Sequence, residues 1–151
     1  MKSVIFCASQ RFAKELLEFM DRLRALTPPE QSITIFHPHF ERDPLPELMS
    51  LTESERMKHE AYRRTVAGSI LRHNRLIRKA QVCFIFNKNR YIGYNTFGEL
   101  VAAAERDKIV YALEKPIMVG RYPNEMYEEP VANEYVDDFV PTPEALIKFL
   151  I

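Results

Sequence analysis

A polar loop and the start of the helix after it hold the residues of this chain best suited to chemistry. The loop covers residues 87–95, and Thr96-Phe97-Gly98-Glu99 follows it. A carboxylate such as Glu99 can act as a nucleophile or as a general acid and base when it stands at the rim of a cleft. The same four residues also form a capping-box pattern, in which Glu99 reaches back to the backbone N–H of Thr96. The local pattern alone leaves both interpretations open.

The loop itself offers further candidate ligand-binding residues. Asn87 and Asn95 can donate and accept hydrogen bonds around a ligand, although asparagine is also a common turn residue. Tyr91 and Tyr94 can either stack on a ring or support the loop. We expect Gly93 to supply a turn conformation with positive φ.

Motifs for metals and cofactors are missing from the sequence. It contains neither a Walker A loop nor the Gly-x-Gly-x-x-Gly fingerprint. His37 and His39 flank Pro38 without a third ligand nearby. Cys7 and Cys83 sit in apolar runs, where a thiol behaves as a small hydrophobe. We therefore predict no metal site and no cofactor.

Apolar runs at regular intervals predict the strands that position this loop. The runs cover residues 4–8, 32–36, 82–86 and 109–113, and residues 135–140 are a candidate fifth strand. A helix with one apolar face follows the first run and stops at Pro28-Pro29. Residues 37–50 are predicted to be a long loop of functional type, and residues 120–134 an irregular excursion.

Capping patterns mark two further helices. Thr52 and Glu55 form a capping box before a helical segment that runs to Lys79, and Gly68 leaves open whether this segment is one helix or two. Thr142, as N-cap, and Pro143 begin the last helix.

Alternating strands and helices predict an α/β fold: a doubly wound, flavodoxin-like parallel five-stranded sheet of order 2-1-3-4-5 with helices on both faces. In such a sheet, ligands bind at the carboxyl ends of the strands, where the strand order reverses. This point lies between the first and third strands. It brings the residues after the first strand, Ala8, Ser9, Gln10 and Arg11, beside the loop at 87–99.

Composition limits the classes of partner. The 151 residues predict a single domain covering residues 1–151, with 46% apolar and 28% charged residues and a formal net charge of zero. Nucleic acid and membrane are therefore not favoured as partners. No signal peptide or membrane-length apolar run is evident, so we expect a cytoplasmic protein. Residues 56–79 hold eight Lys or Arg and one acid, which indicates a solvated helix face or, alternatively, a surface for nucleic acid or an acidic partner.

The segment Tyr91-Ile92-Gly93-Tyr94-Asn95-Thr96-Phe97-Gly98-Glu99-Leu100, with Ala102 to Ala104 behind it and a strand after it, resembles the nucleoside 2-deoxyribosyltransferase-like superfamily. His73, Ile77 and Ala80 before the strand resemble that superfamily too. The specific similarity covers residues 72–115. It implies that Glu99 is a nucleophile that attacks the anomeric carbon of a nucleoside, expels the base and forms a glycosyl ester.

Two positions depart from the superfamily pattern. Gln81 stands where an acidic residue commonly closes the helix, and Gly93 stands where the transferases carry an aspartate. These departures favour a relative with another substrate, a hydrolase of N-glycosides, or a non-catalytic nucleotide or nucleotide-sugar binder. Ser9, Gln10 and Arg11 suit a phosphate, although Arg11 can equally be a surface residue. The resemblance further implies a homo-oligomer, at least a dimer.

Overall fold

The centre of the fold is a parallel five-stranded sheet, seen in a computed structural model that describes residues 2–38, 46–48 and 50–151. The strand order confirms the predicted fold class, with the first and third strands adjacent at the point where the order reverses. In order across the sheet the strands are β2 (Ile33–Phe36), β1 (Lys2–Cys7), β3 (Val82–Ile85), β4 (Ile109–Ala112) and β7 (Asp138–Phe139).

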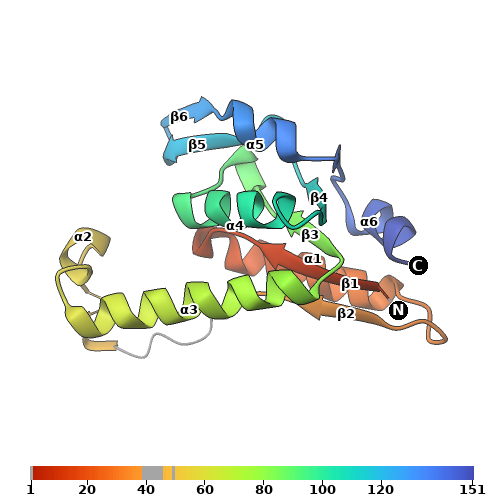
Figure 1. The fold of residues 1–151 in the computed structure, drawn as a ribbon, viewed down its shortest axis with the longest axis horizontal. Helices are drawn as coiled ribbons and strands as arrows, with labels where there is room; N and C mark the ends of the chain where they lie inside the picture. The colour runs from red at the N-terminus through yellow and green to blue at the C-terminus, as the bar shows by residue number, and fades with distance from the viewer. Residues whose placement is uncertain (1, 39–45, 49) are drawn as a thin grey trace.

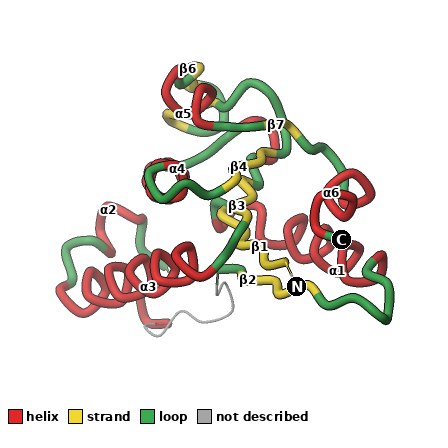
Figure 2. The backbone as a smooth tube through the Cα atoms, turned by 45° about the vertical axis from the view of Figure 1, so that its right-hand side comes forward, coloured by secondary structure: helices red, strands yellow, loops and turns green. Residues whose placement is uncertain are grey.

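Helices cover both faces of this sheet, as Figures 1 and 2 show. One face carries the first and last helices, α1 (Ala13–Leu26) and α6 (Pro143–Leu150). The other face carries α3 (Glu60–Lys79), α4 (Tyr94–Ala104) and α5 (Pro130–Tyr135). Short 3-10 turns at Gln10–Phe12, Pro46–Leu48 and Lys88–Arg90 and the single-turn α2 (Glu53–Arg56) join these elements.

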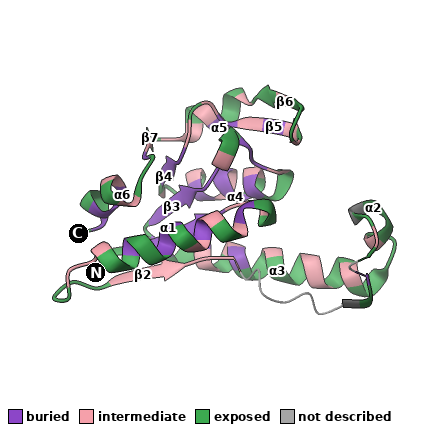
Figure 3. Cartoon of the chain, turned by 180° about the vertical axis from the view of Figure 1, so that it is seen from behind, coloured by how far each residue is buried: buried purple, intermediate pink, exposed green. Residues whose placement is uncertain are grey.

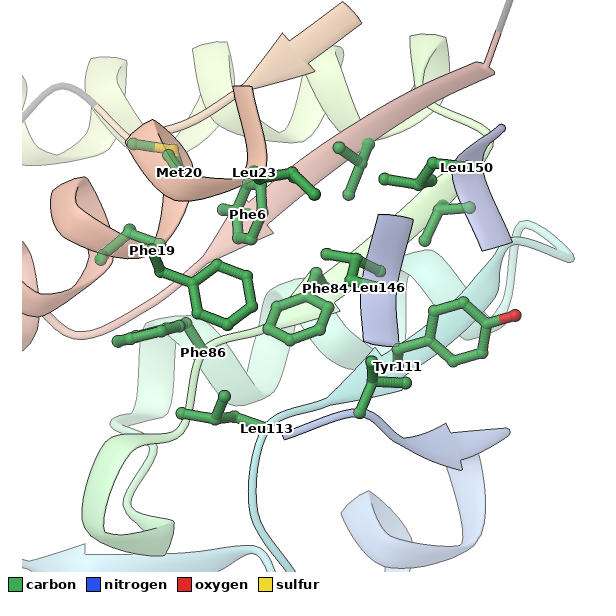
Figure 4. Close-up of a cluster of buried hydrophobic side chains, with 14 of the residues drawn as sticks. Phe6, Phe19, Met20, Leu23, Phe84, Phe86, Tyr111, Leu113, Leu146 and Leu150 are labelled. Atoms are coloured by element: carbon green, nitrogen blue, oxygen red, sulfur yellow. The ribbon is translucent and has the colours of Figure 1, made fainter. Parts of the chain in front are cut away.

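Alternating side chains of the central strands build a separate core on each face. Val4 and Phe6 of β1 point toward α1 and α6, and Figure 4 shows Phe6 and Phe84 among the leucines of that core. Ile5 and Cys7 point the other way, toward α3 and α4. Because β3 and the part of β1 from Val4 to Cys7 are buried on both faces, these residues are all apolar, as is typical of central parallel strands.

The structure resolves the question at Gly68 and corrects two predicted regions. Helix α3 runs unbroken through Gly68, and the segment from Thr52 to Lys79 is instead divided at residues 57–59 into the short α2 and the long α3. The predicted irregular segment at 120–134 instead holds a small antiparallel pair, β5 (Met118–Arg121) with β6 (Glu125–Glu128), and most of α5. The fifth strand of the main sheet is only Asp138–Phe139, because α5 ends at Tyr135. Most of the predicted loop at 37–50 lies outside the described residues.

The capping predictions for two helices are confirmed. Thr142 accepts a hydrogen bond from the N–H of Ala145 (3.1 Å) at the start of α6. Thr52 and Glu55 make reciprocal bonds: Thr52 N–H donates to Glu55 Oε2 (2.8 Å), and Glu55 N–H donates to Thr52 Oγ1 (3.3 Å).

Helix α3 extends beyond the sheet, and its N-terminal half lies with α2 away from both cores (Figures 1 and 3). Of its side chains, His73 and Ile77 in the C-terminal half are buried, while Val66 and Ile70 on the same stripe are half-buried. Among the described residues, no helix is long and apolar enough to cross a membrane.

Candidate functional site

Glu99 lies in the second turn of α4, which corrects its predicted place in the first turn. The helix begins at Tyr94 with Gly93 as N-cap, so Thr96 is already the third helical residue. The predicted capping box is therefore wrong, because Thr96 does not stand at the N-cap that such a box requires. Glu99 instead turns its carboxylate inward and is 9% exposed.

A cleft of about 780 Å³ lies above this carboxylate at the carboxyl ends of β1, β2 and β3. One wall is the inner face of α3 from Tyr62 to Leu76, and the other is the start of α4. The turn after β1 and the residues after β2, His37 and Pro38, close its end. The cleft thus lies at the reversal of strand order, where the sequence predicted a ligand site. A second depression, of about 380 Å³, lies at the amino ends of β1 and β2 around Lys2 and Glu30, away from Glu99.

Three polar side chains from three elements meet on the floor of the cleft. They are Cys7 at the end of β1, His73 of α3 and Glu99 of α4. His73 Nε2 lies 3.3 Å from Cys7 Sγ and 3.8 Å from Glu99 Oε2. His73 and Glu99 line the cleft, whereas Cys7 is fully buried behind them. The three ligand atoms all lie within 4.8 Å of one another.

Burial sets the protonation of this cluster. It raises the pKa of Glu99 to about 7, an effect that a hydrogen bond from Cys7 partly offsets. Burial also raises the pKa of the Cys7 thiol well above its usual range, and the neighbouring Cys83 and Glu99 raise it further. Near neutral pH, Glu99 therefore exists in comparable amounts as acid and carboxylate, while Cys7 remains a thiol.

These contacts do not form a cysteine protease-like triad. In such a triad, one imidazole nitrogen faces the nucleophile and the other faces the carboxylate. Here the same Nε2 atom of His73 faces both Cys7 and Glu99. A thiol that is fully buried and has a raised pKa is also a poor nucleophile. Of the two acidic side chains in the cluster, Glu99 is the one that combines cleft access with an ionised, nucleophilic form at neutral pH.

Most of the residues predicted for the site lie together in the cleft. Its lining includes Ala8, Ser9, Gln10, Arg11, Tyr91, Gly93, Asn95, Thr96 and Glu99. Ser9 holds the turn after β1 by accepting a hydrogen bond from the N–H of Arg11 (3.4 Å).

Asn87 is the exception, because its side chain serves the fold. It is completely buried, and its Nδ2 donates to the carbonyl of Glu114 (2.7 Å). Its Oδ1 accepts from the backbone N–H groups of Leu113 and Glu114, each at 3.0 Å. Asn87 therefore joins the end of β3 to the end of β4 and lies outside the residues that line the cleft.

The backbone conformation of Gly93, in the loop before α4, differs from the prediction. Gly93 has φ −85°, so the prediction of a positive φ there is wrong. Asn89 and Arg90 adopt the left-handed conformation instead, with φ of 54° and 67°.

The two tyrosines of the loop have different surroundings. Tyr91 is buried against the rings of Phe12 and Tyr122, which indicates a supporting role. Tyr94 is 78% exposed at the rim of the cleft, where it can stack on a ring.

Sequence reasoning did not assign a site role to four residues of the cleft and its floor. Cys7 was interpreted as a small hydrophobic residue of a strand, and His73 as part of the resemblance before the third strand. Arg56 and Arg72 were counted in a basic helix face, yet both line the cleft. One feature of the sequence pointed to His73: it interrupts the otherwise apolar stripe of Val66, Ile70 and Ile77. A polar residue at such a position is typical of a helix face that lines a cleft.

No protein-family model matches this chain, and no curated protein matches it in sequence.

Proposed function

We propose that this protein cleaves or transfers the N-glycosidic bond of a nucleotide, with Glu99 as the nucleophile. The observation that carries the proposal is the inward-facing carboxylate of Glu99 on the floor of a cleft at the reversal of strand order. The resemblance of residues 91–100 to the deoxyribosyltransferase-like superfamily supplies the reaction class. The N-glycosidic bond passes through an oxocarbenium-like state that a nearby carboxylate stabilises.

In the proposed reaction, a Glu99 carboxylate oxygen bonds to the anomeric carbon as the carbon–nitrogen bond breaks. The base leaves with the bonding electron pair and is protonated. Water then attacks the glycosyl ester and releases the sugar and free Glu99, or a second base attacks and receives the sugar. The pKa of about 7 keeps a substantial fraction of Glu99 ionised and ready to attack at neutral pH.

The charge of the cleft favours a phosphorylated substrate over a plain nucleoside. Among the described residues that line it, Arg11, Arg56 and Arg72 are cationic and Glu99 is the one acid. Arginine forms bidentate hydrogen bonds with phosphate oxygens. We assign the phosphate to two arginines of the cleft: Arg11 beside Ser9 and Gln10, where the sequence also suggested it, and Arg72 of α3. Tyr94, at the rim, is suited to stack on the base.

A second candidate function is nucleotide or nucleotide-sugar binding without turnover. The observation that favours it is Gly93, which leaves the start of α4 without the aspartate that handles the base in the transferases. The same cleft and the same arginines serve this function. Homo-oligomer formation is a further part of the proposal, because the outer half of α3 bounds the cleft without joining either core.

The experiment is a panel of 2-deoxynucleosides, ribonucleosides and their 5′-monophosphates, assayed for base release and for thermal stabilisation of the protein. Release of base from a monophosphate supports the enzymatic function and identifies the sugar. Stabilisation by a monophosphate without release supports the binding function. Neither effect with any compound would contradict both.

A further inference from the structure

We infer that Cys7, His73 and Glu99 form a binding site for a divalent transition-metal ion, with Zn²⁺ as the best match. This inference goes beyond the proposed glycosidic reaction and does not depend on it. It rests on the convergence of one sulfur, one nitrogen and one oxygen ligand from β1, α3 and α4.

The spacing of the three ligand atoms suits a tetrahedral zinc ion. Bond lengths of about 2.3 Å to sulfur and about 2.0–2.2 Å to nitrogen and oxygen place the ligand atoms of such an ion roughly 3.4–3.6 Å apart. The observed separations are 3.3 Å for Cys7 Sγ to His73 Nε2 and 3.8 Å for His73 Nε2 to Glu99 Oε2. These two separations thus lie within a few tenths of an ångström of the tetrahedral values, and the third, from Cys7 Sγ to the Glu99 carboxylate, is at most 4.8 Å.

The choice of ligand types selects the class of metal. Mg²⁺ and Ca²⁺ prefer sets of oxygen ligands, and neither favours a thiolate. A thiolate, an imidazole and a carboxylate are ligands typical of zinc sites, and binding of Zn²⁺ to Cys7 releases the thiol proton to solvent.

The surroundings of the cluster resemble a metal site with one open position. Cys7, His73 and Glu99 are at most 9% exposed, so an ion here exchanges its water shell for protein ligands. Cys7 lies behind the other two, which both line the cleft. A fourth ligand, either water or a group of a small molecule, therefore approaches from the cleft.

Zinc at this position also occupies the carboxylate assigned as the nucleophile. If the glycosidic reaction takes place, Zn²⁺ and substrate compete for Glu99, and zinc inhibits base release. The metal site is tested without substrate, so the two proposals fail independently. Binding without base release would contradict the reaction alone, and base release without metal binding would contradict the metal site alone.

The test is metal binding by the reduced, chelator-treated protein. Isothermal titration with Zn²⁺ measures stoichiometry and affinity, and Mg²⁺ is the control ion. Co²⁺ substitution reports the ligands, because a cysteine ligand produces a thiolate-to-cobalt charge-transfer absorption band. We expect one Zn²⁺ per chain, a cobalt derivative with this band, and no heat of binding with Mg²⁺.

Two matched variants test the ligand assignment. Cys7 and Cys83 are both fully buried thiols on adjacent strands, with sulfur atoms 3.7 Å apart, but the metal-ligand cluster includes Cys7 and not Cys83. We expect Cys7→Ala to weaken zinc binding by roughly 100-fold or more and to abolish the cobalt band. We expect Cys83→Ala to retain both.

The outcomes that overturn the inference are equally specific. Wild-type protein that binds no Zn²⁺ at micromolar concentrations, or that gives a cobalt derivative without the thiolate band, would contradict it, and neither result depends on a variant. Equal effects of the two alanine substitutions would contradict the assignment of Cys7. Should Cys7→Ala fail to fold, His73→Asn is the second variant, and zinc binding of wild-type strength in it would contradict the site.

Discussion

His73 Nε2 and Glu99 Oε2 lie 3.8 Å apart and link α3 to α4 across the floor of the cleft. Both side chains are at most 9% exposed, so water contributes little to stabilising a charge on Glu99. Because desolvation dominates, the pKa of Glu99 rises to about 7 even though Cys7 donates a hydrogen bond to it. The ionised form of Glu99, which we propose as the nucleophile, therefore lowers the free energy of unfolding.

The raised pKa makes stability depend on pH. The folded state binds a proton at Glu99 more tightly than the unfolded state, whose pKa is near the usual 4.5. The free energy of unfolding therefore falls as pH rises from about 4.5 to about 7, by an amount on the order of 3 kcal/mol from this group. We expect Glu99→Gln to match the wild type near pH 5 and to be more stable at pH 8, as measured by urea denaturation at both pH values.

Glu18→Gln is the control for this pH dependence. Glu18 is an exposed glutamate within α1, far along the chain from the cleft. We expect Glu18→Gln to have the same difference in free energy of unfolding between pH 5 and pH 8 as the wild type. A Glu99→Gln protein whose stability falls with pH as steeply as that of the wild type would show that burial does not raise this pKa.

Asn87 is expected to contribute to stability without affecting ligand binding. Its side chain makes one donated and two accepted hydrogen bonds with the backbone at the end of β4, and it is completely buried. Asn87→Ala removes the side-chain partner of the Glu114 carbonyl and of the N–H groups of Leu113 and Glu114. It should lower the free energy of unfolding by about 2–4 kcal/mol. Asn95→Ala, at an exposed position of α4, should change it by less than about 0.5 kcal/mol. Equal stabilities of the two variants in urea denaturation would contradict this role.

Arg72 is expected to discriminate nucleotides from nucleosides. Arg72 and Arg75, one turn apart on α3, are both exposed, but Arg72 lines the cleft and Arg75 lies outside the lining. Arg72→Ala should weaken binding of a nucleoside monophosphate by roughly tenfold or more, since a hydrogen bond to a charged group contributes about 1.5–3 kcal/mol. Binding of the matching nucleoside should change little.

Calorimetric titration of both ligands with both variants tests this prediction. Arg75→Ala is the matched control and should bind the monophosphate as the wild type does. If Arg72→Ala and Arg75→Ala weaken binding of the monophosphate equally, the effect comes from the overall positive charge of α3 and not from a phosphate contact.

Adding a side chain at Gly93 and at Gly120 should have opposite effects on stability. At Gly93, a Cβ atom would have Tyr91 Oη as its nearest neighbour at 3.5 Å, and an aspartate there can cap α4. Gly93→Asp should therefore keep or slightly raise stability, by a few tenths of a kcal/mol. At Gly120, φ is +129° and a Cβ would lie 2.5 Å from the carbonyl oxygen of Glu125.

Thermal unfolding of Gly93→Asp and Gly120→Ala distinguishes these cases. Gly120→Ala should lower the free energy of unfolding by roughly 1–3 kcal/mol because both backbone conformation and space oppose it. Loss of more than about 1 kcal/mol in Gly93→Asp would show that the start of α4 has no room for the aspartate of the transferases.

The sheet could be predicted from the sequence because its central strands are buried on both faces. The runs at 4–8, 82–86 and 109–113 are apolar for that reason, and their alternation with helices fixes a parallel sheet and its point of reversal. Most of the cleft residues followed from that topology. The pair β5–β6 was not predicted because its strands are short and partly exposed, so they lack the continuous apolar signal.

The floor of the cleft could not be predicted, since its partners come from three distant segments. Cys7 sits in an apolar strand, and the sequence does not indicate that it faces His73, 66 residues away. The N-cap of α4 was misplaced by three residues because Thr96 is a good N-cap by type, whereas the helix begins after Gly93. Asn87 was assigned to the ligand because a polar side chain after a strand is also typical of a binding loop.

The most direct test of the central claim is base release from the preferred nucleoside monophosphate by wild type and Glu99→Gln at equal folded concentration. Glutamine keeps the shape of the side chain but has no carboxylate, so only the chemistry of position 99 changes. We predict release by the wild type and a loss of at least about 100-fold in the variant, with its circular dichroism spectrum unchanged. Base release by Glu99→Gln at the wild-type rate would contradict Glu99 as the nucleophile.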